Sequence, residues 1–416
     1  MLGARPQGHK ERSVAIDSDG AKLERNQQLD GLRGFAALAV AVHHTLLEMG
    51  QPKALDLWYA TIQSLGDGYS IATKIALILF PGDVAVAIFF ILSGAVLFNS
   101  LMHETRPLAS ASVNFIYRRI LRIYPALFVS LIVYFFALKL YLGLPFSFSD
   151  FFENAALRSF RINGTTWTLN VEFVVVPVFL AAYFAFRRNG AWGMVLFFLA
   201  LWLGSALPWF KYPELARASV FCFVLGMFIP TRSGQWLANR FPANVWPLLL
   251  ILMLSSRHLI EGQKTGSNIQ QISAALFVML LYYDKVPLLG RLLQSRFAQF
   301  LGRISYSFYL YHALCVILVC HYVLGQASIS AATHPLEAGL LASLVVVGLT
   351  IPVAYLSKGL FEDPFIRLGK RPLFRTTSSI GPAKVETAGP REIIEPALAQ
   401  VIGDKGRTSL SAQRST

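Results

Sequence analysis

An arginine and a histidine lie inside the first long apolar run of the chain, residues 29–44 (LDGLRGFAALAVAVHH). Arg33 and His44 are eleven residues apart. At ~100° per residue, a helix brings both to one face, about 16 Å apart along its axis. Ionisable groups are costly inside a membrane and usually face a protein interior or a water-filled cavity. A cation near one membrane surface and a titratable base about half-way across therefore predict two parts of one functional site.

A second cationic group lies in residues 114–125 (NFIYRRILRIYP). Arg119 and Arg122 are three residues apart and share a helix face, with Arg118 beside them. One interpretation is a membrane anchor or a contact with lipid head groups. The other is a phosphate clamp, because the arginine fork matches phosphate oxygens in bidentate geometry. Together with Arg33, such a clamp would meet an anionic, nucleotide-like substrate that arrives from the cytosol.

A carboxylate lies in residues 165–173 (TTWTLNVEF), where Glu172 falls inside a predicted span. A buried carboxylate must pair with a cation, line a wet cavity or become protonated. Glu172 is thus either a structural partner for one of the arginines or a group that orients His44 or the acceptor. We predict a catalytic role for His44 and Glu172.

Residues 301–312 (LGRISYSFYLYH) place Tyr311 and His312 several residues inside another predicted span. His312 is either a structural histidine with satisfied hydrogen bonds or a further polar group of the site. We assign His312, Tyr311 and Trp167 to substrate binding, with the four arginines. His43 and His44 are adjacent and project ~100° apart on a helix, so no metal site is predicted.

Composition places these residues in a membrane protein. The 416 residues are 55% hydrophobic and only 14% charged, whereas soluble domains carry about 25% charged residues. The formal net charge is +14, but Lys and Arg lie mainly in tails and short loops, as membrane topology requires. With no basic soluble domain, nucleic-acid binding is excluded. The three cysteines lie in apolar runs without CxxC spacing, which predicts neither a disulfide nor a zinc site.

The scaffold is predicted to be all-α, a polytopic bundle of about ten transmembrane helices, since a span needs about 20 apolar residues. With the N-terminus in the cytoplasm, most loop arginines fall inside, and an even number of spans places both termini there. A transmembrane domain over residues 27–375 is flanked by flexible cytoplasmic tails, residues 1–26 and 376–416. The predicted spans are residues 32–49, 83–101, 123–142, 168–187, 192–208, 217–231, 245–256, 268–283, 304–324 and 337–360.

In combination these segments resemble the acyltransferase-3 family, bacterial integral-membrane proteins that O-acylate sugars and lipids. The resemblance rests on residues 29–44, 89–98 (FFILSGAVLF), 117–128 (YRRILRIYPALF) and 305–312 (SYSFYLYH), supported by residues 166–173 and 361–371. It implies ten core spans and a coenzyme A thioester as acyl donor. The resemblance also implies that two residue pairs correspond to the pairs that are essential in the family, namely Arg33 with His44 and Arg119 with Arg122.

The expected function is transfer of an acyl group from acyl-CoA to a hydroxyl of a cell-surface or lipid-linked carbohydrate, with His44 as general base. Family analogy favours acetyl-CoA as co-substrate, with no bound cofactor. The expected location is the bacterial inner membrane, in contact with lipids. The alternative is a transporter or flippase for a glycolipid or polysaccharide, which uses the same polar cavity without acyl transfer.

Overall fold

The computed structural model describes residues 26–204, 214–260, 263–325 and 333–371. These residues form helices and turns, with no strand among them, so the all-α class is confirmed. The predicted tails, residues 1–26 and 376–416, lie outside the described residues except for Asn26. Their cytoplasmic location and the limits of the transmembrane domain stay predictions.

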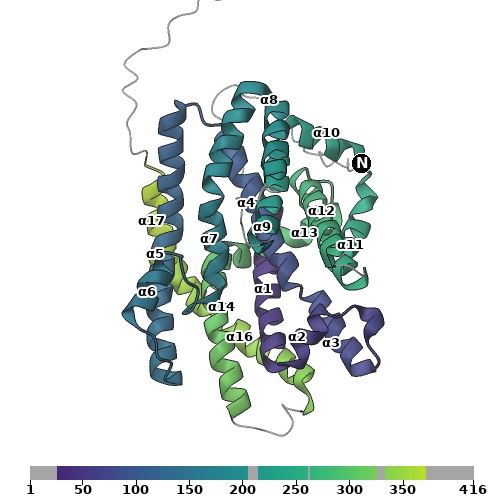
Figure 1. Cartoon of the computed structure of the whole chain (residues 1–416), viewed down its shortest axis with the longest axis vertical. Helices are drawn as coiled ribbons and strands as arrows, with labels where there is room; N and C mark the ends of the chain where they lie inside the picture. The colour runs from purple at the N-terminus through teal and green to yellow at the C-terminus, as the bar shows by residue number, and fades with distance from the viewer. Residues whose placement is uncertain (1–25, 205–213, 261–262, 326–332, 372–416) are drawn as a thin grey trace, which may run out of the picture. The chain divides into compact units, whose positions relative to one another are not determined.

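The chain folds into long helices joined by short helical segments and turns (Figure 1). The α-helices are α1 (Gln27–Met49), α2 (Lys53–Tyr59), α3 (Gly68–Leu79), α4 (Gly82–Met102), α5 (Leu108–Leu142), α6 (Phe148–Ala155), α7 (Trp167–Val174), α8 (Val176–Gly204), α9 (Glu214–Phe228), α10 (Arg232–Arg240), α11 (Trp246–Leu259), α12 (Gln263–Tyr282), α13 (Pro287–Leu293), α14 (Arg296–Gly325), α16 (Pro335–Ser357) and α17 (Asp363–Gly369). Single 3₁₀ turns are η1 (Ile62–Ser64), η2 (Gly164–Thr166) and η3 (Ala243–Val245), and a π-helical turn, η4 (Lys358–Glu362), joins α16 to α17.

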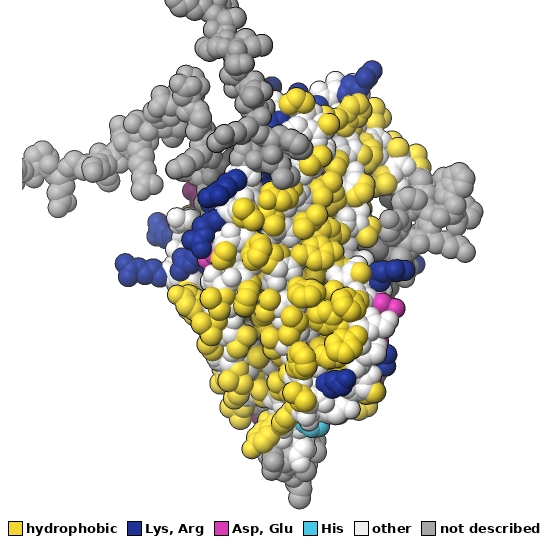
Figure 2. Space-filling model, turned by 90° about the vertical axis from the view of Figure 1, so that its left-hand side faces the viewer, with side chains coloured by type: hydrophobic (Ala, Val, Ile, Leu, Met, Phe, Trp, Pro, Cys, Tyr) yellow, Lys and Arg dark blue, Asp and Glu magenta, His cyan; other side chains and the backbone are white. Residues whose placement is uncertain are grey.

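Several helices are long and apolar enough to cross a membrane. Among the described residues there are five such stretches, or up to seven if two bent helix pairs each count as one span. The chain is therefore a multi-pass membrane protein, but the predicted number of ten spans is not confirmed. Figure 2 shows one face covered largely by hydrophobic side chains, with Lys and Arg toward its borders.

Several helices are bent. The fourth predicted span falls within α7 and α8, and the described part of the fifth, residues 192–204, lies in α8 beyond an interruption at Gly190, where φ is 61° and ψ is −147°. Glycine reaches this left-handed φ without steric cost. The pairs α10 with α11, and α12 with α13, bend by 82°. The number of spans therefore depends on whether the helical segments on either side of a bend are counted as one span or two.

The helix that carries Arg33 and His44 is capped and enclosed. The Asn26 side chain accepts hydrogen bonds from the backbone N–H groups of Gln28 and Leu29, which satisfies two donors at the start of α1. The Asn26 amide also donates to the carbonyl of Tyr282 at 3.1 Å. α1 packs against α14, α16 and α4, and Figure 1 shows it among the other helices. The predicted first span is thus largely enclosed by protein.

The contact between α1 and α14 is unusually close because both helices carry glycine there. A Cβ added to Gly302 would lie 2.2 Å from the carbonyl oxygen of Asp30, and one added to Gly34 would lie 2.6 Å from the backbone nitrogen of Gly302. Small residues allow membrane helices to approach to this distance. Further along, His44 of α1 meets His312 of α14. The chain leads from Gly34 to His44 in α1 and from Gly302 to His312 in α14, so the two helices run parallel.

Candidate active site

A cationic pocket lies between α1, α4, α5, α7 and α14, with a volume of about 210 Å³. Its charged lining consists of four arginines and two glutamates. This excess of positive charge in a low-dielectric cleft attracts anions. The charged residues that line the pocket are Arg33, Arg118, Arg119, Arg122, Glu104 and Glu172.

Arg119 is the most buried of these cations, with 6% of its surface exposed. Its Nη2 donates to a carboxylate oxygen of Glu172 at 3.0 Å and to the backbone carbonyl of the same residue at 2.8 Å. The buried Nε of Arg119 has no hydrogen-bond partner among the described residues. One donor of this guanidinium is therefore unsatisfied within the described residues.

The other arginines surround Arg119 at different depths. Arg33 Nη1 lies 3.4 Å from a carboxylate oxygen of Asp30, one turn earlier on α1. Arg118 Nε donates to the carbonyl of Gly369 in α17 at 3.2 Å. Arg122 has an exposed side chain in the pocket. The pocket thus combines one buried guanidinium with several that solvent or a ligand can reach.

Two aromatic residues of the pocket lining pack against each other. Tyr309 and Phe89 pack edge to face with ring centroids 5.7 Å apart, and both line the pocket. The Tyr309 hydroxyl donates to the carbonyl of Thr165 at 3.3 Å. On its other side Tyr309 contacts His312, with ring centroids 5.3 Å apart. Tyr309 therefore lies between the arginines and a pair of histidines.

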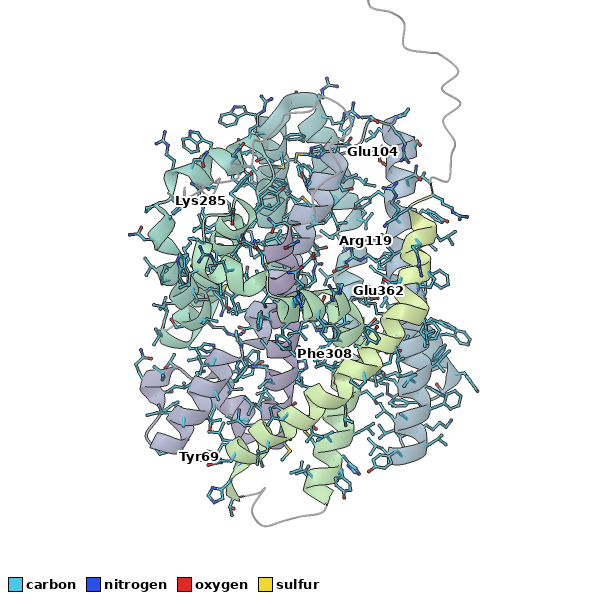
Figure 3. All side chains as sticks on the ribbon, turned by 180° about the vertical axis from the view of Figure 1, so that it is seen from behind. Tyr69, Glu104, Arg119, Lys285, Phe308 and Glu362 are labelled. Atoms are coloured by element: carbon cyan, nitrogen blue, oxygen red, sulfur yellow. The ribbon has the colours of Figure 1, made fainter. Side chains whose placement is uncertain are left out.

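The histidine pair joins α1 to α14. His44 Nδ1 lies 3.1 Å from His312 Nε2, and the two rings are inclined by 21° with their centroids 5.2 Å apart. His312 is fully buried, and its Nδ1 lies 2.7 Å from the carbonyl oxygen of Tyr309. The ring of Phe308 lies nearly parallel to that of His312, with centroids 6.4 Å apart. Figure 3 shows Phe308 displaced from Arg119 along the vertical axis, and neither His44 nor His312 belongs to the lining of the arginine pocket.

His43 projects away from this pair, as adjacent residues on a helix must. Its Nδ1 lies 3.0 Å from the carbonyl oxygen of Phe80, and its ring packs edge to face on Trp58. Beside it, Arg257 pairs with Asp83 at 2.5 Å and lies 4.4 Å from the Trp58 ring. This charged cluster fastens α11 to α4 and α2 and is separate from the pocket.

The structure brings together most of the predicted site residues. Arg33, the three arginines of α5 and Glu172 line one pocket. Of the two roles left open for Glu172, the structure shows the ion pair with an arginine. The hydrogen-bond partner of His44 is His312, which does not line the pocket. The catalytic and binding roles themselves stay predictions.

Besides His44 and His312, the predicted substrate-binding residues Trp167 and Tyr311 also lie outside the pocket lining. Trp167 packs edge to face on Phe90, with centroids 6.1 Å apart, and Phe90 is itself a lining residue. Tyr311 is 3% exposed and packs in an apolar cluster with Ile123 and Leu314. Trp167 thus supports the wall of the pocket, and Tyr311 contributes to the core beside it.

Sequence reasoning missed Tyr309 and Phe89, two aromatic residues of the pocket lining. Tyr309 precedes His312 by three positions, so the two share a face of α14, which the sequence could have indicated. Phe89 carries no such signal, because it is one phenylalanine in a long apolar run. Its role depends on a contact with Tyr309, 220 positions later in the chain.

Within the described residues, no group of three or more His, Cys, Asp or Glu side chains could hold a metal ion. Cys222, Cys315 and Cys320 are free thiols. A family model described as an acyltransferase domain, the model of the acyltransferase-3 family, matches residues 26–358. No curated protein and no solved structure matches the chain. The matched range contains the whole pocket lining and the histidine pair.

Proposed function

We propose that this chain, which belongs to the acyltransferase-3 family, transfers an acyl group from acyl-CoA to a hydroxyl of a cell-surface or lipid-linked carbohydrate. The observation that carries the proposal is the arginine pocket, whose lining includes Tyr309, a residue in ring contact with His312 of the histidine pair. An anion-binding end and a general-base end are the two parts that such a transfer needs. We place the reaction in the bacterial inner membrane, with surrounding lipids as the protein's other partners.

The pocket suits the phosphates of coenzyme A. Arginine guanidinium groups bind phosphate through paired hydrogen bonds that are stronger than bonds between neutral groups. Arg119 supplies an unpartnered buried Nε, and Arg122 an exposed guanidinium in the same pocket. We expect the phosphates to bind these groups and Arg33, with the thioester directed past Tyr309 toward His44. Family analogy favours acetyl as the acyl group.

The transfer itself needs a base at the acceptor hydroxyl. In the proposed reaction His44 takes the hydroxyl proton while the oxygen attacks the thioester carbonyl, forming the ester C–O bond. The carbon–sulfur bond then breaks, and the His44 imidazolium returns the proton to the departing coenzyme A thiolate. General-base assistance of this kind contributes typically ~10²–10⁴-fold to the rate.

The decisive experiment compares a deletion strain with strains that carry wild-type protein, His44→Ala or His321→Ala. His321 is an exposed histidine of α14 and serves as the matched control. Mass spectrometry of the cell-surface glycans should show an acyl mass that is present with wild type and His321→Ala. The same mass should be absent from the deletion strain and from His44→Ala.

A transporter or flippase predicts a different result. It would move a glycan without consuming acyl-CoA, so the deletion would change the location of the glycan and not its acyl mass. Membrane vesicles supplied with acetyl-CoA test the point directly, since only an acyltransferase releases free coenzyme A. A changed glycan location with no coenzyme A release in either strain would overturn the proposal.

A further inference from the structure

The two ring nitrogens of His312 make different hydrogen bonds, and this fixes where its proton lies. Nδ1 lies 2.7 Å from the carbonyl oxygen of Tyr309, which can only accept, so Nδ1 carries a hydrogen. His312 is fully buried, and within the described residues its ring bonds to this carbonyl and to His44, neither of them an anion. A charged imidazolium without a counter-charge would be costly there. His312 is therefore neutral, and its Nε2 holds a lone pair.

The proton position on His44 follows from that lone pair. His44 Nδ1 lies 3.1 Å from His312 Nε2, within hydrogen-bond distance. Because His312 Nε2 accepts, His44 Nδ1 must donate. A neutral imidazole carries hydrogen on only one nitrogen, so the Nε2 of His44 holds the lone pair. His44 is half-buried, whereas His312 is wholly enclosed.

We propose that His312 is a positioning residue, which holds His44 in the Nδ1–H tautomer and leaves His44 Nε2 as the atom that accepts the acceptor's proton. This inference rests on the proposed function, in which His44 is the general base. It replaces the expected role of His312 in substrate binding with a role exerted through His44.

The position of Glu172 supports this assignment. Carboxylates commonly orient a catalytic histidine, but the Glu172 carboxylate bonds to Arg119. In the proposed arrangement the neutral His312 orients His44 through Nε2, and the carbonyl oxygen of Tyr309 polarises the His312 ring through its hydrogen bond with Nδ1. When His44 becomes an imidazolium, its Nδ1–H bond to His312 Nε2 becomes charge-assisted and stronger. The chain from Tyr309 to His44 thus stabilises the protonated base without a buried carboxylate.

Solid-state NMR reads the tautomer directly and does not need activity. The wild-type protein is labelled with ¹⁵N and ¹³C at its histidine rings and placed in lipid bilayers at neutral pH. Nδ1 and Nε2 are distinguished because Nδ1 is bonded to Cγ and Nε2 to Cδ2. Difference spectra against His44→Asn and His312→Gln assign the two rings among the eight histidines. We expect hydrogen on Nδ1 and a lone pair on Nε2 in both rings; hydrogen on His44 Nε2 would overturn the proposal.

Variants of His312 separate positioning from simple packing. The Oε1 of His312→Gln can accept from His44 Nδ1, whereas His312→Leu offers no acceptor. With acetyl-CoA and membrane vesicles, we expect His312→Leu to lower kcat by up to ~10²–10⁴-fold, the typical range of general-base assistance. We expect His312→Gln to retain much more activity. The KM for acetyl-CoA should stay unchanged, because His312 does not line the arginine pocket.

Non-additivity gives a second test. A chain that lacks both His44 and His312 should be no slower than His44→Ala alone, because His312 acts only through His44. Equal activity of His312→Leu and wild type would overturn the inference. The tautomer measured by NMR stands even if no vesicle releases coenzyme A, so failure of the proposed function and failure of this inference are distinguishable.

Discussion

Gly302→Ala tests whether the close contact between α1 and α14 sets the geometry of the site. The added Cβ would lie 2.2 Å from the carbonyl oxygen of Asp30 and 2.6 Å from its carbon. Non-bonded heavy atoms reach their optimum near ~3.5 Å, so the two helices must separate by about 1 Å. The same separation would lengthen the 3.1 Å bond between His44 and His312 beyond hydrogen-bond range.

The matched control is Gly348→Ala in α16, where an added Cβ meets nothing within 4 Å. Both changes gain the same helix propensity, about 1 kcal/mol in favour of alanine. The difference between the two variants therefore isolates the steric effect, which for overpacking is typically ~1–3 kcal/mol. We expect Gly302→Ala to be less stable than Gly348→Ala by this amount.

The assay is thermal unfolding of the detergent-solubilised protein followed by tryptophan fluorescence, with coenzyme A release measured in parallel. A displacement of about 1 Å at a catalytic group can cost ~10²-fold in rate. Gly302→Ala should lose activity at temperatures where it is still folded, whereas Gly348→Ala should not. Equal unfolding temperatures together with wild-type activity for Gly302→Ala would refute the reasoning.

Three further outcomes are expected. Arg122→Ala should weaken coenzyme A binding by about 10–100-fold in titration calorimetry, since a hydrogen bond to a charged group contributes ~1.5–3 kcal/mol; unchanged affinity would contradict a phosphate contact. Glu172→Gln should destabilise the protein in chemical unfolding, with ~3–5 kcal/mol as an upper bound because Glu172 is partly exposed. The double variant Arg119→Met with Glu172→Gln should recover part of the lost stability, because it no longer buries an unpaired charge. Arg257→Lys should lower the unfolding temperature through its contacts with Trp58 and Asp83, yet leave coenzyme A affinity at the wild-type value.

Helical periodicity was sufficient to group residues that lie on one element. Arg119 and Arg122, three positions apart, both line the pocket, and Arg33 lines it from α1. The sequence left Glu172 to pair with a cation, line a wet cavity or become protonated, and the structure shows it paired with Arg119. These predictions hold because they depend on local geometry and on the cost of burying a charge.

Contacts between elements distant in the chain were beyond such reasoning. His44 and His312 are 268 positions apart, and nothing in either segment specifies that α1 and α14 run parallel and meet at Gly302. The predicted ten spans are not confirmed, because the number of crossings depends on whether the helical segments on either side of a bend, as in the pairs α10–α11 and α12–α13, count as one span or two. The pairing of helices is a property of the packed bundle.

The spacing of Arg33 and His44 along α1 limits the length of the substrate that can reach both residues at once. Arg33 and His44 are eleven residues apart on one helix, which spaces the proposed phosphate-binding end from the proposed base by about 16 Å along the axis. A shortened thioester could satisfy one end or the other, but not both at once. An inhibitor with an anionic head at one terminus and an imidazole-binding group at the other would need a linker of that length. Inserting a single residue between Arg33 and His44 would turn the base by ~100° and uncouple the two ends.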